Sequence, residues 1–225
     1  MIDTYLHKLS YNPFTSFEPV CHLADTLTIM VVNGDSKFRS LADILNAARA
    51  KRGTLTIGTV GPGTTGHMAI EALKRVAGVD MIFVPYPGNP QAVTAVLGHN
   101  LDVALSGYPV VAGLVSSGKL RALATTTPAR IEPLPDLPTV AESGYAGHGL
   151  NFWMGLVAPA KTPFETTSTL GRWFVAALQS PETKAKLKEQ GFYPVGSCGA
   201  DFAAFIRQQS AEYRRVIRAA NIKVE

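Results

Sequence analysis

The sequence predicts an α/β fold in which strands and helices alternate along the chain. Between residues 26 and 124, apolar runs rich in β-branched residues alternate with segments whose apolar residues recur at helical spacing. Glycine or proline marks most of the transitions. A hydrophobic content of 46% with 17% charged residues is typical of a globular protein, and 225 residues suffice for one large or two small domains. We therefore expect a sheet rich in parallel strands, flanked by helices.

The first predicted elements are two strands and a helix. Residues 17–21 indicate a short strand, which Pro19 places at a sheet edge or strand start because proline cannot donate to a ladder. Residues 26–32 are a continuous apolar and β-branched run, as in a strand buried on both faces. Ser40 is the expected N-cap of an amphipathic helix, with Asp43 at its third position completing a capping box.

Residues 55–78 indicate a strand, a glycine-rich turn and a helix. The strand is apolar and β-branched, and the glycines of Gly61-Pro-Gly-Thr-Thr-Gly66 let the backbone approach another group closely. Either Thr64 or Thr65 caps the helix. Because the first N–H groups of a helix lack partners and lie at the positive end of its dipole, helix starts bind anions. This segment therefore predicts a cradle for a small anion.

A second turn of the same kind follows. Residues 81–86 indicate a strand, and Asn89 is the expected N-cap of a helix with Pro90 at its first position. Residues 101–105 and 120–124 indicate two more strands, with a short helix between them. In α/β sheets ligands bind beyond the carboxyl ends of the strands. Helix starts from two successive strand–helix units can therefore converge on one carboxylate.

The pattern changes after residue 124. Prolines between residues 128 and 138 predict a rigid, exposed connector, and a short helix is expected around residues 139–143. Residues 150–158 are an extended apolar segment, and the patterning beyond it is helical. We therefore place a boundary near residue 150, with an α/β part before it and a helical layer after it.

Three helices are expected in the C-terminal part. The first begins at a capping box, Thr162-Pro-x-Glu165, and the second at Ser180, which is followed by a proline. The apolar residues of the last helix share one face. They are Phe202, Phe205, Ile206, Gln209, Tyr213, Val216 and Ile217.

The glycine-rich turn formally matches the dinucleotide-binding pattern G-x-G-x-x-G. That fold also requires an acid at the end of the next strand for the ribose hydroxyls, and Val84-Pro-Tyr86 contains none. Pro62 removes one of the N–H groups that a pyrophosphate would use. An NAD(P)-dependent oxidoreductase is therefore kept only as the enzymatic alternative, and no cofactor is expected.

Catalytic and metal-binding patterns are weak. His67, Asp102 and Ser106 are the residue types of a hydrolase triad, but no G-x-S-x-G elbow presents a serine. The five histidines are scattered without metal-ligand spacing. We therefore expect no catalytic residue, no metal ligand and no enzymatic activity.

Charge and cysteine content restrict the partners further. The net charge is +4, and the basic residues near the C-terminus fit a solvated helix face better than a surface for nucleic acid. Cys21 and Cys198 do not make a disulfide framework, and we do not favour a bridge between them. No apolar run is long enough to span a bilayer, and the first ten residues lack the pattern of a secretory signal.

Taken in order, these segments resemble the Bug-type extracytoplasmic solute receptors, the substrate-binding components of tripartite tricarboxylate transporters. The resemblance extends through almost the whole chain, and the ordered set is far more specific than any one segment. The segments are Tyr11-Asn-Pro to Val20, Gly58 to His67, Val84-Pro-Tyr-Pro-Gly88, Val96 to Asp102, Ser117 to Ala124, Leu134 to Gly144 and Trp153 to Pro159.

The resemblance implies a two-lobed fold of the periplasmic binding protein type II kind. The first lobe would comprise residues 1–28 and 153–225, and the second residues 29–152. A small carboxylate would be captured between the lobes by backbone N–H groups, hydroxyls and waters and delivered to a membrane permease. Carried onto this sequence, the ligand-binding residues would be Thr59, Gly61, Gly63, Thr64, Thr65, His67, Gly88 and Asn89.

The sequence also departs from the family pattern. Relatives usually carry a secretory signal and a further N-terminal segment that forms the other side of the site, so we expect a truncated first lobe. Such a lobe would expose apolar surface and favour self-association. The location is periplasmic by resemblance, or cytoplasmic if Met1 is the true start. Pro87 and Ser106 replace residues common in the family, so a degenerate, non-binding fragment is the other alternative.

Overall fold

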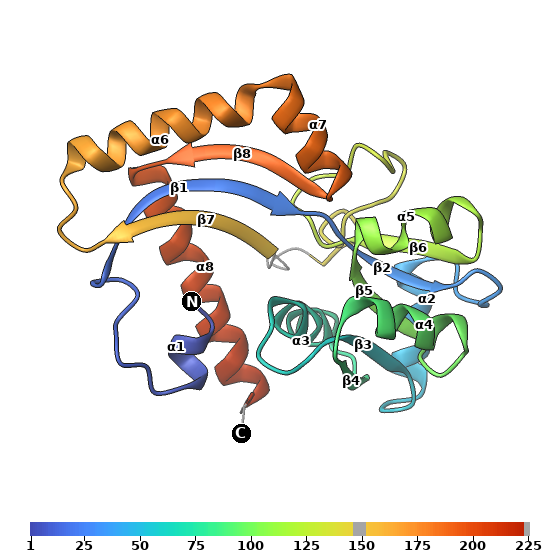
Figure 1. Cartoon of the computed structure of the whole chain (residues 1–225). Helices are drawn as coiled ribbons and strands as arrows, with labels where there is room; N and C mark the ends of the chain where they lie inside the picture. The colour runs from blue at the N-terminus through green and yellow to red at the C-terminus, as the bar shows by residue number, and fades with distance from the viewer. Residues whose placement is uncertain (146–151, 223–225) are drawn as a thin grey trace. The chain divides into compact units, whose positions relative to one another are not determined.

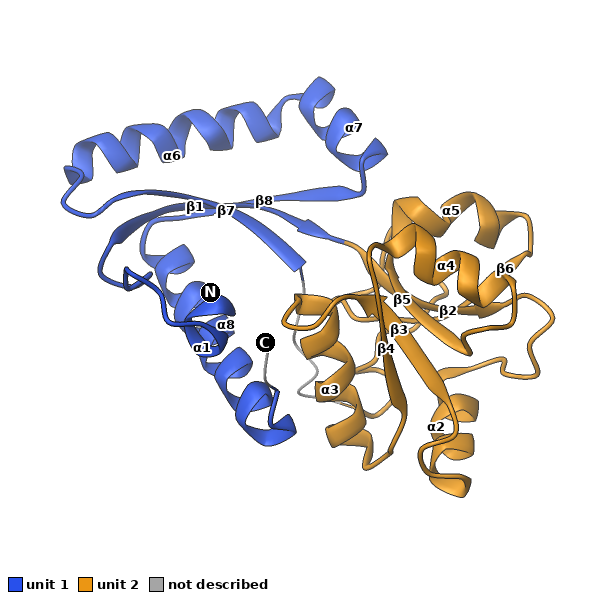
Figure 2. Cartoon of the chain, turned by 60° about the horizontal axis from the view of Figure 1, so that its bottom comes forward, with its two compact units in different colours: residues 1–26, 152–225 blue, residues 27–151 orange. Residues whose placement is uncertain are grey.

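The computed structural model describes residues 1–145 and 152–222, which form two compact units (Figure 1). Unit 1 comprises Met1–Thr26 and Phe152–Glu225, and unit 2 comprises Leu27–Asn151 (Figure 2). Each unit has a β-sheet of its own. The fold is thus α/β, as the sequence predicts.

Unit 2 is built on a five-stranded sheet with the order β4-β3-β5-β2-β6. Strands β3, β4 and β5 are parallel, whereas β2 is antiparallel to both β5 and β6. The carboxyl ends of β3, β4, β5 and β6 therefore share one edge of the sheet, which we call the carboxyl edge. The strands are β2 (Thr28–Asn33), β3 (Thr56–Val60), β4 (Ile82–Tyr86), β5 (Val103–Gly107) and β6 (Leu120–Thr125).

Helices cover both faces of this sheet. Helix α2 (Leu41–Ala50) lies beside α3 (Thr65–Ala77), and a hydrogen bond of 3.0 Å from Arg49 of α2 to the carbonyl of Ala77 joins the two helices. Helices α4 (Asn89–Leu97) and α5 (Tyr108–Ser116) cover the other face (Figure 2). The chain runs from β3 outward to β4 and then back past β3 to β5, so the two crossovers run in opposite directions across the sheet. Because both crossovers are right-handed, their helices α3 and α4 lie on opposite faces.

The helix starts of unit 2 largely follow the sequence. Ser40 and Asp43 form the predicted capping box, and Thr64 caps α3 by accepting from the N–H of His67. Helix α4 differs, because Gly88 is its N-cap and Asn89 its first helical residue. The prediction that Asn89 is the cap is therefore wrong. The extended backbone of Gly88 allows its carbonyl to accept the first helical hydrogen bond, so the helix starts one residue earlier.

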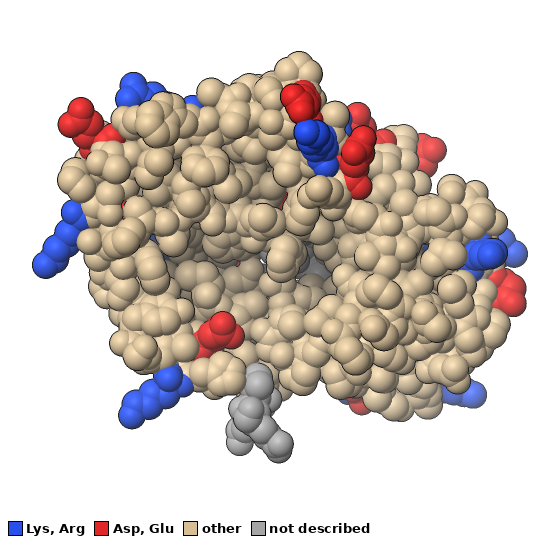
Figure 3. Space-filling model, in the orientation of Figure 1, with Lys and Arg blue, Asp and Glu red and all other residues tan. Residues whose placement is uncertain are grey.

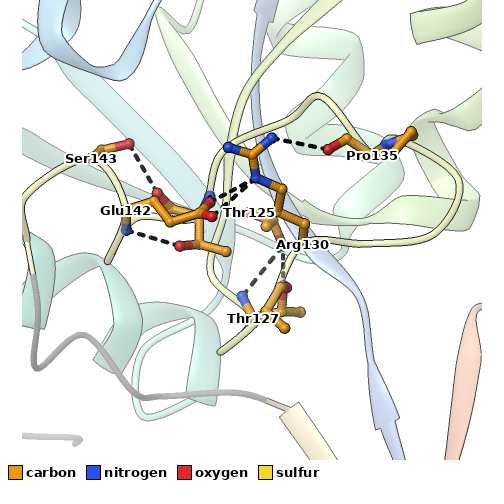
Figure 4. Close-up of polar contacts among 8 residues, drawn as sticks. Thr125, Thr127, Arg130, Pro135, Glu142 and Ser143 are labelled. Carbon is orange, nitrogen blue, oxygen red and sulfur yellow. Dashed lines mark hydrogen bonds and ion pairs between the residues drawn. The ribbon is translucent and has the colours of Figure 1, made fainter.

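The connector after β6 consists of turns rather than the helix predicted at residues 139–143. Thr139 and Glu142 nevertheless exchange the two bonds of a capping box, at 2.8 and 2.9 Å. Figure 4 shows Arg130 between Glu142 and the carbonyl of Pro135, with both carboxylate oxygens of Glu142 3.0 Å from Arg130 Nε. The predicted helix is therefore absent, because Pro138 precedes the segment and Gly144, at a φ of 94°, ends it after too few residues.

Unit 1 is built on a three-stranded antiparallel sheet with β1 (Phe17–Thr26) between β7 (Phe152–Pro159) and β8 (Phe192–Cys198). The strand predicted at residues 17–21 is therefore longer than expected and lies at the centre of the sheet. Of the two predicted positions for Pro19, an edge or a strand start, the structure shows the second. Two features accommodate Pro19. Pairing with β8 begins only at Cys21, and the register with β7 shifts between Pro19 and Cys21.

Strand β8 was not predicted, because Pro194 and Gly196 interrupt its pattern and Gly196 has a φ of 74°. The C-terminal part is therefore not purely helical. The register of β8 places Cys198 opposite Cys21, and a disulfide joins the two. The bridge that we considered possible but did not favour is therefore present. Nothing in the sequence indicated it, because 177 residues separate the pair and only the strand pairing brings them together.

Helices lie on both faces of the sheet of unit 1. Helix α6 (Phe164–Gln179), followed by α7 (Pro181–Glu189), covers one face, and α8 (Ala200–Ala220) covers the other (Figure 1). The short α1 (Asp3–Leu6) is joined to α8 by the 2.6 Å hydrogen bond between Tyr5 and Ser210. Apart from Phe205, which is half-buried, the residues predicted to share one face of α8 are buried.

The start of α6 differs from the sequence prediction. No side chain caps this helix, and the hydroxyl of Thr162 donates to the carbonyl of Pro159 at 2.7 Å. The predicted capping box is therefore absent, because Thr162 closes the turn that leaves β7. Ser180 caps α7 as expected, accepting from the N–H of Thr183.

Candidate functional site

Two turns leave the sheet of unit 2 side by side at its carboxyl edge. Strands β3 and β4 pair in parallel, with Val60 opposite Tyr86, so the turn after each strand begins at the same level. The N–H of Gly61 donates to the carbonyl of Tyr86 at 3.1 Å and ties the two turns together. Because α3 and α4 lie on opposite faces, this is a point where the strand order reverses, the usual ligand position in such sheets.

The first turn is held by its own hydrogen bonds. The N–H of Gly63, at a φ of 76°, donates to Nδ1 of His67 at 3.3 Å. The hydroxyl of Thr64 lies 2.9 Å from the carbonyl oxygen of Val60 and 3.0 Å from that of Gly61. Three predicted ligand contacts, the N–H groups of Gly61 and Gly63 and the hydroxyl of Thr64, are thus engaged in shaping the turn.

Donors remain at the starts of the two helices. Thr65 and Gly66 are the first residues of α3, and Gly88 and Asn89 begin α4. N–H groups in a first helical turn have no acceptor within the helix, and the helix dipole makes that end positive. Gly66 was not among the predicted contacts, although its place in the turn was recognised.

The three helices that start at the carboxyl edge share an unusual feature. Among the described helices, α3, α4 and α5 carry no acidic residue in the first turn, whereas each of the other five has one. An acidic side chain would offset the positive end of the dipole. At this edge, therefore, no acidic residue within the first turn offsets the positive end of any of the three helix dipoles.

Thr59 lies beneath the start of α3. It is 3% exposed, and a Cβ atom on Gly66 would come within 2.7 Å of its hydroxyl oxygen. Glycine at position 66 therefore lets α3 sit directly on β3. A ligand role for Thr59 remains a prediction, and its visible role is to support the helix start.

His67 is buried behind the first turn. Its ring stacks on Phe83 of β4 with a centroid distance of 4.1 Å and an angle of 14° between the planes. Burial lowers the pKa of His67, with Glu71 acting in the opposite direction and Lys74 adding to the effect. Glu71 and Lys74 form an ion pair with each other at 2.8 Å. The imidazole is therefore neutral at neutral pH.

A third turn at the same edge was missed as a site feature. Strand β5 ends at Gly107, which is also the N-cap of α5, and the N–H of Tyr108 donates to the carbonyl of Leu27 at 2.8 Å. Ser106 is buried, and its hydroxyl donates to the carbonyl of Gly107 at 3.3 Å. The signal was present in Ser106-Gly-Tyr-Pro109, which is again a strand end followed by glycine and a helix with an early proline.

The hydrolase triad is not assembled. Asp102 precedes β5 at the opposite edge of the sheet, where its carboxylate accepts from the N–H and the hydroxyl of Thr56, both at 2.8 Å. Ser106 lies near the other end of the same strand. Within residues 1–145 and 152–222, no group of three or more His, Cys, Asp or Glu side chains could hold a metal ion.

A cavity of about 960 Å³ lies along β6, the outer strand at the opposite end of the strand order from β4. Its walls are formed mainly by leucines and prolines of α2, β6 and the connector. Arg121 also lines it, but its guanidinium donates to the carbonyls of Gly34, Ser36 and Phe38. Arg39 also lines the cavity, whose walls are otherwise mainly apolar.

The face drawn in Figure 3 shows no continuous basic patch among the described residues. On the face drawn in Figure 3, basic and acidic side chains of the described residues are few and intermixed. Nucleic-acid binding requires a continuous basic patch or stripe. Of the helices in the described part of the chain, none combines the length and apolarity needed to cross a bilayer.

Comparison with known proteins identifies the family. The family model described as "Tripartite tricarboxylate transporter family receptor" matches residues 2–222. A Pseudomonas sp. (strain P51) protein, "UPF0065 protein in tcbD-tcbE intergenic region", is 28% identical over 219 residues, covering 96% of this chain and 65% of its own length. The chain thus spans about two thirds of the length of this relative.

Two solved structures give the same result. The periplasmic binding protein BugD is similar with a TM-score of 0.79 and 26% identity, over 100% of this chain and 76% of BugD. R. palustris Rpa4515, solved with adipate, is similar with a TM-score of 0.77 and 31% identity, over 98% of this chain and 74% of Rpa4515. The chain belongs to the Bug-type receptors of the tripartite tricarboxylate transporter family.

Proposed function

We propose that the protein is a solute receptor that captures a small carboxylate and delivers it to the membrane permease of a tripartite tricarboxylate-type uptake system. One observation carries this proposal. Helices α3 and α4 begin side by side at the carboxyl edge, with first-turn N–H groups available and no acidic residue in either first turn. An anion at that point gains several charge-assisted hydrogen bonds at once.

The eight predicted ligand-binding residues have two roles in this proposal. The backbones of Thr65, Gly88 and Asn89 donate to the carboxylate, together with that of Gly66. The remaining residues shape or support the cradle, which is consistent with their internal hydrogen bonds and burial. They are Thr59, Gly61, Gly63, Thr64 and His67.

Relatives support a carboxylate as the ligand. Rpa4515, which is 31% identical to this chain, was solved with adipate. Because a dicarboxylate of this kind has a second charged end, the second carboxylate would be bound outside the two turns. The dinucleotide alternative lacks an acid for the ribose, since β4 ends in Pro85 and Tyr86.

The setting that we propose is the periplasm, with no catalytic step. The disulfide between Cys21 and Cys198 supports an oxidising compartment, because such bonds are rare where thiols are kept reduced. The family consists of receptors rather than enzymes. Capture and release of an unchanged ligand require only positioned donors, and the site residues described above supply these.

Calorimetric titration with adipate, malate, adipamide and NAD⁺ tests the proposal. Adipate and malate carry carboxylates, whereas adipamide has the same carbon skeleton as adipate without charge. We expect binding of at least one dicarboxylate, none of adipamide and none of NAD⁺. Binding of NAD⁺ alone, or of no carboxylate at all, would overturn the proposal.

Replacing Thr65 by proline provides a direct test of the backbone donor. Thr65 is the first helical residue of α3, where proline is tolerated but has no N–H. We expect Thr65→Pro to weaken dicarboxylate binding about 10- to 100-fold, as for a lost hydrogen bond to a charged group. Thr65→Ala is the matched control, because it removes the hydroxyl and keeps the N–H. Equal affinity of the two variants would exclude this N–H as a ligand donor.

A further inference from the structure

His67 connects the glycine-rich turn to the helix that follows it at two points. Its side chain accepts from the N–H of Gly63 at 3.3 Å, and its own N–H donates to the hydroxyl of Thr64 at 3.3 Å. Gly63 and Thr64 directly precede the first N–H groups of α3. The imidazole therefore determines the position of the proposed donors without being one itself.

The hydrogen bond from Gly63 fixes the tautomer of the imidazole. Nδ1 can accept this bond only when it carries no proton, so the proton of the neutral ring is on Nε2. The ring has little freedom to turn, because it is 9% exposed and stacked on Phe83. The position of Nδ1 relative to Gly63 is thus held from both sides.

We propose that neutral His67 is the positioning residue of the carboxylate site and that its protonation weakens ligand capture. The inference deepens the proposed function and rests on it. The imidazolium ion has N–H groups at both nitrogens, so Nδ1–H would face the N–H of Gly63. The hydrogen bond from Gly63 would be lost, and two N–H donors would face each other. The turn must then open, and the first N–H groups of α3 move with it.

The surroundings of the ring contain few other titratable groups. The charged groups that act on it are Glu71 and Lys74, both on α3 and paired with each other. Strands β3, β4 and β5 lie against or beside α3 and carry one ionisable residue, Tyr86. Helix α2, which also lies beside α3, carries Asp43 and Arg49. A change in affinity between about pH 5 and 8 that depends on position 67 therefore reports the histidine itself.

The sign of the pH effect follows from the tautomer. Capture requires the neutral ring, and burial holds the pKa of His67 below its usual value. Affinity should therefore be complete at neutral pH and should fall in the acid range, by up to about tenfold for each pH unit below the pKa of the ligand-free form, until the lower pKa of the bound form is reached. Direct contact between an imidazolium and the carboxylate would have the opposite effect, because binding would strengthen in acid.

Two substitutions at position 67 separate these cases. In His67→Asn the side-chain oxygen lies at about the place of Nδ1, so it can accept from Gly63 but cannot titrate. His67→Ala removes the acceptor. We expect the alanine variant to bind adipate about tenfold more weakly at every pH and the asparagine variant to bind nearly as tightly as the wild type at neutral pH. His99→Asn, at an exposed histidine of the same unit, is the control.

The decisive measurement is the ratio of adipate affinities of the wild type and His67→Asn across the pH range. The titration of adipate itself cancels in this ratio. We expect the ratio to fall with decreasing pH, while the ratio of the wild type to His99→Asn stays constant. A constant ratio at position 67, or one that rises in acid, would overturn the inference and leave the proposed function intact. A wild type that binds no dicarboxylate would instead overturn the proposed function, and this inference with it.

Nitrogen-15 NMR of the imidazole provides a test that needs no ligand. We expect the Nε2–H tautomer at neutral pH and a Gly63 amide signal that shifts with the same midpoint as the ring. A proton on Nδ1 at neutral pH, or a Gly63 amide that does not follow the titration, would contradict the proposed link. This readout distinguishes positioning of the turn from a general loss of stability, which would move many amides together.

Discussion

The two units differ in how much apolar surface they leave exposed, although helices lie on both faces of each sheet. In unit 2, central residues such as Ile29, Ile57 and Val103 are fully buried. In unit 1, large apolar side chains of α6 are exposed to solvent: Phe164 is 83% and Trp173 67% exposed. Unit 2 therefore has the core that a rigid binding edge requires. Unit 1 has a smaller core, next to which a covalent bond joins two strands.

The comparison shows where the molecule should resist change. A site made of backbone N–H groups works only if the strand ends beneath it do not move, because each hydrogen bond requires its donor in place. The uncovered surface of unit 1 carries no such requirement. We therefore expect substitutions to affect the two units separately, and the two tryptophans allow this to be measured, since Trp153 and Trp173 both belong to unit 1.

The largest expected effect comes from the core of unit 2. Leu45 of α2 is fully buried, so Leu45→Ala should reduce the free energy of unfolding of unit 2 by about 2–5 kcal/mol. Chemical denaturation followed by circular dichroism should show an earlier transition, while the midpoint of tryptophan fluorescence stays in place. Val195→Ala, at an exposed residue of β8, should change neither probe. A parallel shift of both probes in Leu45→Ala would mean that the units unfold as one.

The disulfide provides the converse test. Cys198→Ser removes a link between residues 177 apart in sequence, and links of this kind stabilise small units by about 2–4 kcal/mol. We expect the tryptophan transition of unit 1 to move to lower denaturant, with little change in dicarboxylate affinity at unit 2. The wild type in the presence of a reducing agent is the matched control. An unchanged tryptophan midpoint would show that the core of unit 1 is sufficient without the bond.

The smallest expected effect concerns the connector of unit 2. The N–H of Thr139 and the guanidinium of Arg130 hold the pKa of Glu142 below its ordinary value of 4.5. A carboxylate with a lowered folded-state pKa adds stability above that ordinary value and loses it as the pH falls through the lower one. Glu142→Gln should therefore lower the melting temperature slightly at neutral pH and not at all in strong acid. Glu189→Gln, on exposed α7, is the control. A difference independent of pH would exclude the charge as the cause.

Local signals in the sequence were sufficient for much of unit 2. The capping box of Ser40 and Asp43 and the cap at Thr64 depend on residues within one helical turn, and the structure confirms them. The receptor family and its α/β fold were likewise recognised from the ordered motifs. Strand β8 was missed, because Pro194 and Gly196 are compatible with a strand only at a sheet edge, and edge position is a property of the whole fold.

The site shows the same division between local and distant causes. The sequence located both turns, because glycine and proline at strand ends are local signals. It did not indicate which N–H groups were already in use. Gly61 donates to Tyr86 on a neighbouring strand, and Gly63 donates to a histidine ring held in place by Phe83. The Cys21–Cys198 bond was missed for the same reason, because strand register brings together residues that the sequence separates.

The two outer strands of unit 1 differ in their suitability as templates for another chain. Pro194 and the positive φ of Gly196 interrupt β8, whereas β7, Phe-Trp-Met-Gly-Leu-Val-Ala-Pro, carries no charge and has no proline before its last residue. Uninterrupted, uncharged outer strands start intermolecular ladders at high concentration. Strand β7 should therefore limit the concentration at which the purified protein stays clear. Met154 is 43% exposed, so Met154→Lys would place a charge on this strand and should raise the concentration reached in crystallisation or NMR samples.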